Sequence, residues 1–251
     1  MSRFKSYYEN RLLVVLFLFF FAAGIRLFNF AQAGQTWDET AYITDGYKLV
    51  GHIKNLDFNN LDWYSRPDHP PVAKYFYGLT AYLDKDGAFP DGKPSFAYDF
   101  NFSRLLSLLF GSLSVVLTAL LGIRFFSKEI GVMAGIILAT LPILVGMNQL
   151  ITLESPIVLF FIATIYSFLV LLEKPTGKLI VLTAVLLGLT LGIKLTNILI
   201  MPILLAILFF WYWEIGRKNT SRKDILKILL IFPISVAIFF ISWPALWFHA
   251  Q

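Results

Sequence analysis

The sequence has no cysteine and few charged residues, and each shortage excludes a class of site or fold. Without cysteine, disulfide bonds and thiolate metal sites are excluded, although this absence does not identify a compartment. Charged residues make up only 15% of the 251 residues, whereas hydrophobic residues make up 57%. Soluble domains usually contain about 25% charged and about 45–50% apolar residues. The composition therefore predicts a membrane protein.

The net charge of +5 does not indicate a nucleic-acid partner. Most of the basic excess lies in short loops between apolar runs rather than on one patch or stripe. Basic residues in short loops are typical of membrane proteins, where they set the orientation of the spans. We therefore expect membrane lipids, and no nucleic acid, among the partners of this chain.

Seven apolar runs predict an all-α, polytopic membrane helix bundle that forms a single module over residues 1–251. A span needs about 20 mostly apolar residues. Only a helix satisfies its own backbone polar groups in lipid, and the alternating pattern of a membrane β-barrel is missing. The fifth and sixth runs are nearly fused, and we place the break between them at Lys194. The predicted spans are 12–30, 104–123, 130–147, 155–172, 179–193, 196–213 and 225–245.

The distribution of lysine and arginine predicts a cytoplasmic N-terminus. The loops at 124–129, 173–178 and 214–224 all carry basic residues, whereas the segment 148–154 has none. Basic residues are enriched in cytoplasmic loops, so every loop indicates the same orientation. The opposite ends of the spans, with any active site there, then face the extracytoplasmic or luminal side.

The segment AQA at 31–33 resembles the cleavage site of a signal peptide. However, Arg26 and the bulky residues LFNF separate it from the apolar run, whereas cleavage sites normally follow a small, uncharged region. We therefore expect the first run to be retained as a span. The six further spans indicate a membrane protein in either case.

Residues 31–103 form the one long loop, which is acidic, with ten Asp or Glu against six Lys or Arg. Apolar residues recur at nearly helical spacing in 39–55 and 69–83, and both pieces are predicted to be helices lying at the membrane interface. Two prolines in the second piece suit the start of a helix, where the missing N–H costs nothing. The stretch 84–95 is rich in turn residues and is predicted to be a loop.

Several charged residues lie near the ends of predicted spans, where burial in lipid is costly, about 2.5–3.5 kcal/mol at the bilayer centre. Under the predicted orientation they face the same side as the acidic pair Asp38–Glu39 and as His69. We expect acids and bases from several helices to converge there in a water-accessible pocket. The charged residues at these ends are Arg26, Arg104, Glu154 and Lys194.

Each of these residues can also be explained without a role in catalysis or substrate binding. Arg26 and Arg104 could extend their charged ends to lipid headgroups. Glu154 and the acidic pair could be helix N-terminal charges favoured by the helix dipole. His69 by itself would be a surface histidine. Lys194 is flanked by long apolar runs on both sides, so a functional role is favoured there.

Taken together, these residue types suit the transfer of a sugar from a lipid phosphate. A carboxylate can act as a general base on a hydroxyl group. Neighbouring cations can hold a phosphate and stabilise its charge as it leaves. A substrate that is both phosphorylated and apolar, such as a lipid-linked phosphosugar, would reach such a pocket from the outer leaflet.

Several motifs resemble those of the C-type (GT-C) glycosyltransferases over nearly the whole chain. The closest likeness is to the dolichyl-phosphate-mannose-protein mannosyltransferase family, the protein O-mannosyltransferases, and to their bacterial and archaeal relatives, including the lipid A aminoarabinose transferases. The acidic pair alone is a weak signal, whereas these motifs in this order on a seven-span bundle are fairly specific. The motifs are WDETAY (37–42), HPPVAKYFYG (69–78), RLLSLLFGSL (104–113), LESP (153–156) and GLTLGIKLTNILIMP (188–202).

The resemblance implies a polyprenyl-phosphate-linked sugar donor and inverting transfer to a protein, lipid or glycan acceptor on the outer face. It implies that Asp38 is the general base on the acceptor hydroxyl and that Glu39 supports it or positions the acceptor. Lys194 and Arg104 would contact the donor phosphate. The residues that the resemblance assigns to substrate binding are His69, Lys74, Arg104, Glu154 and Lys194.

The resemblance also implies that no cofactor is needed. The energy for transfer comes from the sugar–phosphate bond of the donor, and the sequence has no Gly-rich phosphate loop. Some distant members use a divalent metal, and Asp38, Glu39 and Glu154 carry suitable oxygen ligands. The pattern of the O-mannosyltransferases argues against a metal here.

Members of this family are usually much longer, with more spans or a soluble C-terminal domain. The resemblance therefore covers their shared catalytic module, with a missing domain or a partner subunit supplying the rest. Two other functions stay open: a non-catalytic module of a larger glycosyltransferase complex, and a lipid or sugar transporter. The transporter is less favoured because the two halves show no inverted repeat of broken helices.

Overall fold

The computed structural model describes residues 2–84, 100–216 and 221–248, and all regular structure in these residues is helical. This confirms the predicted all-α fold class. The chain divides into two compact units, each treated separately below. The first unit comprises Met1–Thr44 and Leu79–Leu159, and the second comprises residues 45–78 and 160–251.

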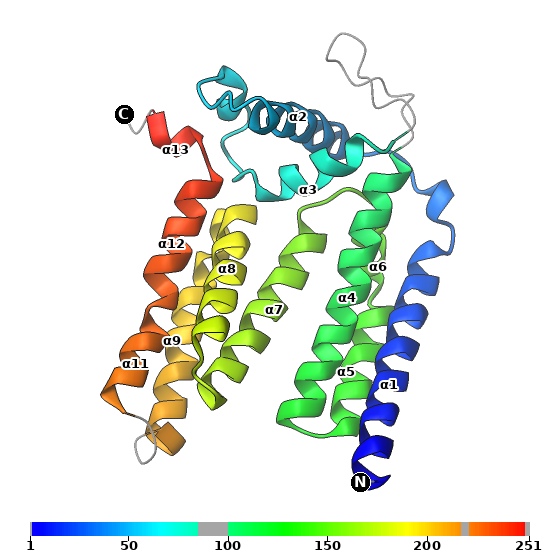
Figure 1. Cartoon of the computed structure of the whole chain (residues 1–251). Coiled ribbons are helices and arrows are strands. Elements are labelled where there is room, and N and C mark those ends of the chain that lie inside the picture. The colour runs from blue at the N-terminus through cyan, green and yellow to red at the C-terminus, as the bar shows by residue number, and fades with distance from the viewer. Residues whose placement is uncertain (1, 85–99, 217–220, 249–251) are drawn as a thin grey trace. The chain divides into compact units, whose positions relative to one another are not determined.

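The first unit is built around helices α1, α4 and α5, which pack along their lengths (Figure 1). Its core contains Leu18 and Ala22 of α1 together with Val115 and Ala119 of α4. Small residues allow close approach, since a Cβ added to Gly131 would lie 2.5 Å from the carbonyl oxygen of Ala119. The helices of this unit are α1 (Ser2–Leu27), η1 (Phe30–Gln32), the start of α2 (Trp37–Lys54), the end of α3 (Val72–Ala81), α4 (Asn101–Phe125), α5 (Lys128–Thr140), α6 (Pro142–Asn148) and the start of α7 (Glu154–Glu173).

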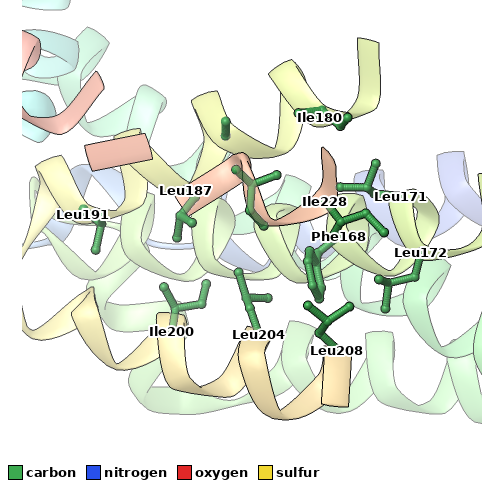
Figure 2. Packing of buried hydrophobic residues seen from close by; sticks show 12 residues of the cluster. Phe168, Leu171, Leu172, Ile180, Leu187, Leu191, Ile200, Leu204, Leu208 and Ile228 are labelled. Atoms are coloured by element: carbon green, nitrogen blue, oxygen red, sulfur yellow. The ribbon is translucent and has the colours of Figure 1, made fainter. Parts of the chain in front are cut away.

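The second unit contains the rest of α2, α3 and α7 and the helices that follow. Its core joins α7, α8, α9, α11 and the start of α12, and Figure 2 shows Phe168, Leu187, Leu204 and Ile228 meeting there. Small residues again permit close packing, because Gly188 of α8 contacts Ile238 of α12. The remaining elements are η2 (Leu61–Tyr64), α8 (Gly177–Ile193), η4 (Leu195–Leu199), α9 (Ile200–Trp211), η5 (Tyr212–Gly216), α11 (Arg222–Leu229), α12 (Ile231–Ser242) and α13 (Ala245–Phe248).

Each predicted span coincides with a helical segment, although they differ in length. Four segments are long and apolar enough to cross a membrane: Asn101–Phe125, Glu154–Glu173, Leu195–Glu214 and Arg222–Ser242. The pair α5 and α6, bent by 62°, makes a fifth if it is one span. The other two predicted spans fall on shorter apolar helices, Leu12–Leu27 and Gly177–Ile193. The structure thus supports four or five spans, and the number seven stays a prediction.

The break between the fifth and sixth runs lies at Lys194, as expected. Helix α8 ends at Ile193, and Lys194 is extended, with φ −152° and ψ 133°. An extended residue interrupts the helical hydrogen bonds, so the chain can begin a new helix in a new direction. This places a charged side chain at the joint between two apolar helices.

The two helices predicted in the long loop are present as α2 and α3. The prolines at 70 and 71 immediately precede α3, which begins at Val72. The turn-rich stretch predicted at 84–95 lies outside the described residues, apart from Asp84.

The backbones of α2 and α3 touch at two glycines in the second unit. A Cβ added to Gly46 would collide with the carbonyl oxygen of Lys74 and would lie 2.8 Å from the amide nitrogen of Gly78. Both are backbone atoms, so relief requires the helices to move apart. Glycine is therefore required at this crossing.

We expect Gly46→Ala to lower the free energy of unfolding by about 1–3 kcal/mol, the usual cost of overpacking a tight contact. Gly24→Ala is the matched control, because a Cβ at that helical glycine would meet nothing within 4 Å. Alanine there should be neutral or stabilising, since it has the higher helix propensity. The midpoints of chemical unfolding of both variants in detergent test this. Equal midpoints for Gly46→Ala and Gly24→Ala would contradict the close contact of α2 and α3 at Gly46.

Candidate functional site

The acidic pair lies in the first turn of α2, and its two members have opposite environments. Glu39 is completely buried, whereas Asp38 is exposed. Consecutive residues on a helix point about 100° apart, which allows one carboxylate to face the packed helices and the other to face away. The two acids therefore cannot have the same role.

Glu39 forms a buried, two-pronged ion pair with Arg104 of α4. The Nε of Arg104 donates to Oε1 at 2.7 Å, and its Nη2 donates to Oε2 at 2.8 Å. The amide N–H of Ile151 also donates to Oε1 at 3.0 Å, and that of Thr36 to Oε2 at 2.8 Å. Four donors on two oxygens make this carboxylate a structural anchor for the start of α2.

Arg104 also holds the segment that leads into α2. Its Nη1 donates to the carbonyl oxygen of Ala33 and its Nη2 to that of Gly34, both at 2.9 Å. Because Arg104 is 8% exposed and bound in this way, it does not extend to lipid headgroups. The guanidinium of Arg104 is thus bound by groups of the protein itself, and its contact with the substrate stays a prediction.

Asp38 differs, because none of the hydrogen bonds or ion pairs found among the described residues involves its carboxylate. Thr36, two residues earlier, lines a groove of about 520 Å³ in the first unit. The groove runs between the 33–36 segment and helix α6, and its lining is completed by Pro142, Ile143, Gly146, Met147, Gln149 and Leu150. The groove is large enough for a small ligand, and the segment that leads into α2 forms one of its walls; Asp38 is not among its lining residues.

Arg26 is also buried, at 1% exposure, which rules out the headgroup interpretation for this residue as well. Its Nε donates to Oδ1 of Asn148 at 2.9 Å, and Nδ2 of Asn148 donates to Oγ of Ser155 at 2.8 Å. Its Nη1 donates to the carbonyl oxygen of Ala139 at 3.3 Å, next to the bend that precedes Pro142. Arg26 thus stabilises the bent pair α5–α6 and belongs to the scaffold of the groove.

In the second unit, Lys74 is buried at 2% exposure and forms an ion pair with Asp45 of α2. Its Nζ lies 3.1 Å from Oδ2 of Asp45 and donates to the carbonyl oxygens of Ser65 and Arg66 at 3.3 and 3.2 Å. Two donors of the ammonium group are therefore used by backbone carbonyls, and Asp45 supplies the counter-charge. The predicted substrate contact of Lys74 stays a prediction. Sequence reasoning missed Asp45, although an acid on the apolar face of an amphipathic helix indicates a buried partner.

His69 and Lys194 are both partly buried in the second unit. Nε2 of His69 lies 3.5 Å from Oδ2 of Asp68. Two residues before Lys194, Gly192 packs against Val72, the first residue of α3. Lys194 therefore lies at the end of α8 that the start of α3 covers, in the same region as the His-Pro-Pro segment.

Glu154 is the first residue of α7 and is partly buried. A carboxylate at this position interacts favourably with the positive end of the helix dipole. A group of three or more Asp, Glu or His side chains able to hold a metal is not found within the ranges that the structure describes.

A second polar cluster joins α2 to η2 in the second unit. His52 contacts two carboxylates, with Nδ1 3.1 Å from Oδ2 of Asp57 and Nε2 2.9 Å from Oδ2 of Asp62. Partial burial alone would raise the pKa of Asp62. Hydrogen bonds from His52 and Lys48, together with their charges, outweigh this effect and lower the pKa below its ordinary value.

Because the pKa of Asp62 is lower in the folded protein, its carboxylate stabilises the fold above the unfolded pKa of about 4. This stabilisation is lost as the pH falls through the folded pKa. We expect Asp62→Asn to lower Tm at pH 7, and the difference from wild type to shrink as the pH drops below about 4. Thermal unfolding of both proteins across this range tests it, with Glu214→Gln as an exposed control. A difference in Tm between Asp62→Asn and wild type that does not change with pH would show that ionisation of Asp62 does not stabilise the fold.

The described residues thus define a helical membrane protein in which buried ion pairs fix the ends of two loop helices and leave Asp38 exposed. A model of the dolichyl-phosphate-mannose-protein mannosyltransferase family matches residues 61–251, more than half of the chain. The chain belongs to this family. No match was found among curated proteins. The matched region begins after the acidic pair and includes the five residues predicted to bind substrate, His69, Lys74, Arg104, Glu154 and Lys194.

Proposed function

We propose that this chain is a membrane glycosyltransferase that moves a sugar from a polyprenyl-phosphate-linked donor to an acceptor on the extracytoplasmic face. Membership of a mannosyltransferase family supports the donor class and makes mannose the first sugar to test. The assignment of Asp38 as the catalytic base rests on the different environments of the two acids. Glu39 is buried and anchored by four donors, whereas Asp38 is exposed and retains its oxygens for a substrate.

In the proposed reaction, Asp38 is the general base. The acceptor hydroxyl oxygen attacks the anomeric carbon of the sugar while Asp38 accepts the hydroxyl proton. The bond from that carbon to the phosphate oxygen breaks, and the polyprenyl phosphate leaves. Attack from the side opposite the phosphate inverts the configuration of the sugar.

Glu39 and Arg104 contribute by positioning. Their ion pair ties the first turn of α2 to α4, so the backbone beneath Asp38 is held in one place. A base that is fixed in orientation needs no reorganisation when the acceptor arrives, and such placement is a large part of catalysis. Lys74 acts similarly on α3 through Asp45.

Lys194 is proposed to bind the donor phosphate. Its ammonium group stands at a break between two apolar helices, and a cation in such surroundings stabilises a leaving phosphate more strongly than one in water. His69 and Glu154 are proposed to contact the substrate from the segment before α3 and from the start of α7. The basic loops at the other ends of the spans support a cytoplasmic N-terminus.

We further propose that transfer requires no divalent metal. Among the acids that could be ligands, Glu39 already accepts four hydrogen bonds, so binding a metal would require its ion pair to break. The developing charge on the phosphate is instead neutralised by protein cations.

The function is tested with the purified full chain in liposomes, given labelled polyprenyl-phosphate mannose and peptide, lipid or glycan acceptors. We expect a labelled product that requires the lipid-phosphate donor, is not formed from a nucleotide sugar, and persists after dialysis against EDTA. Labelled donor that crosses the bilayer without any product would instead support the transporter. Loss of transfer on chelation, restored by a divalent metal, would overturn the metal-free mechanism.

A further inference from the structure

A second groove lies in the second unit between α9 and α11, which are neighbours in Figure 1. It has a volume of about 380 Å³, within the range of about 300–1,000 Å³ typical of ligand sites. Its lining is apolar except at Arg222 and the hydroxyl of Tyr212. The lining residues are Leu205, Leu208, Phe209, Tyr212, Arg222, Ile225 and Leu226.

The apolar walls of this groove are formed by exposed side chains. Phe209 is 60% exposed, Leu226 64% and Leu205 47%. One lining residue, Leu208, is buried and belongs to the core together with Ile228, so this part of the groove wall is packed against the core (Figure 2). An exposed apolar surface of this kind marks a site for a partner or a lipid.

The one charged residue that lines the groove, Arg222, indicates the charge of its occupant. Arg222 is exposed, and none of the hydrogen bonds or ion pairs found in the described part of the chain involves its guanidinium. The neighbouring acid, Asp224, accepts from Oγ of Ser221 at 2.7 Å and from Nζ of Lys227 at 3.2 Å, so it does not neutralise Arg222. Lys223 adds a second exposed cation.

We propose that this groove binds an anionic phospholipid, with one acyl chain along the apolar walls and the phosphate group at Arg222. An apolar groove with one cationic lining residue matches a molecule that is apolar along its length and negatively charged at one end. Basic pockets between membrane helices recognise anionic headgroups in this way. The residues at this end of the second unit carry a net positive charge, from Lys174, Lys178, Arg222, Lys223 and Lys227 against Glu173, Glu214 and Asp224.

This groove is separate from the candidate residues of the same unit. Helix α9 begins near Lys194 and ends at Trp211, so the groove lies at the far end of α9. At the near end, Val72 of α3 packs against Gly192, and the hydroxyl of Tyr75 of α3 donates to the carbonyl oxygen of Ser242 at 2.7 Å. The lipid is therefore a structural or regulatory ligand, and its binding does not depend on the proposed transferase reaction.

Native mass spectrometry of the full chain, released from nanodiscs of dioleoyl phosphatidylglycerol and dioleoyl phosphatidylcholine, tests the proposal. We expect wild type to retain phosphatidylglycerol in preference to phosphatidylcholine. Arg222→Gln should reduce that preference about fivefold, because one basic residue near a membrane surface contributes about 1 kcal/mol. Leu226→Trp, which fills the groove from an exposed position, should reduce retention of both lipids.

The matched control is Lys128→Gln. Lys128 is the first residue of α5 after the capping residue Ser127, just as Arg222 is the first residue of α11 after the capping residue Ser221. It should leave the lipid preference unchanged. Equal effects of the two charge variants, or no headgroup preference in wild type, would overturn the proposal. So would a dimer that disappears with Leu226→Trp, since the occupant would then be a second copy of the chain.

Discussion

Replacement of Asp38 by asparagine is expected to lower the rate of sugar transfer by about 10²–10⁴-fold, the usual contribution of a general base. Asparagine has nearly the same shape but cannot accept the proton of the acceptor hydroxyl. Because Asp38 is exposed and its carboxylate has no partner among the described residues, the variant should fold as wild type does. The predicted result is thus a loss of kcat without a loss of stability.

The measurement is the initial rate of labelled mannose transfer, with Tm recorded on the same samples. Glu129→Gln is the matched control, because Glu129 is the second residue of α5 and exposed, as Asp38 is the second residue of α2 and exposed. The control should retain full activity. Equal transfer by wild type and Asp38→Asn would remove Asp38 from the mechanism, even if the glycosyltransferase function itself held.

Disruption of the buried ion pair should produce the largest loss of stability. We expect Glu39→Gln to lower the free energy of unfolding by about 3–5 kcal/mol, the cost of leaving one member of a buried pair uncompensated. The Arg104 guanidinium would remain at 8% exposure without a counter-charge. The glutamine amide would also present donors to groups that are themselves donors, the amides of Thr36 and Ile151.

A double variant separates the charge pair from simple loss of packing. Glu39→Leu with Arg104→Met removes both charges, and replacing a whole buried pair by apolar groups is often neutral or stabilising. We expect the double variant to regain part of the stability that Glu39→Gln loses, because no buried charge is left uncompensated, although four backbone groups lose the partners that Glu39 and Arg104 provided. Chemical unfolding in detergent measures all three proteins. A Glu39→Gln protein as stable as wild type would show that the pair is not an anchor.

The helical membrane fold could be predicted because its determinants are local in the chain. Apolar run length, basic loops and helical spacing are each read within about 20 residues. The structure has helices at every predicted span, and it has α2 and α3 within the long loop. The break at Lys194 was also predictable, because a charge between two apolar runs marks an interruption.

The partners of the charged residues could not be predicted, because they are far apart in the chain. Glu39 and Arg104 are separated by 65 positions, and Arg26 and Asn148 by 122. Arg26 and Arg104 were open to a headgroup interpretation, and burial excludes it for both. The convergence of Asp38 and Lys194 in one pocket stays a prediction.

The amino-acid pattern is sufficient to make this chain a bundle of apolar helices with an acidic loop that carries two helices, because hydrophobic burial and backbone hydrogen bonding act on short segments. The assignment of Glu39 as the anchored acid and Asp38 as the exposed one required the packed fold. Two adjacent carboxylates are chemically alike. They differ in the folded protein because Arg104 and the amide of Ile151, both distant in the chain, bind Glu39 together with the nearby amide of Thr36.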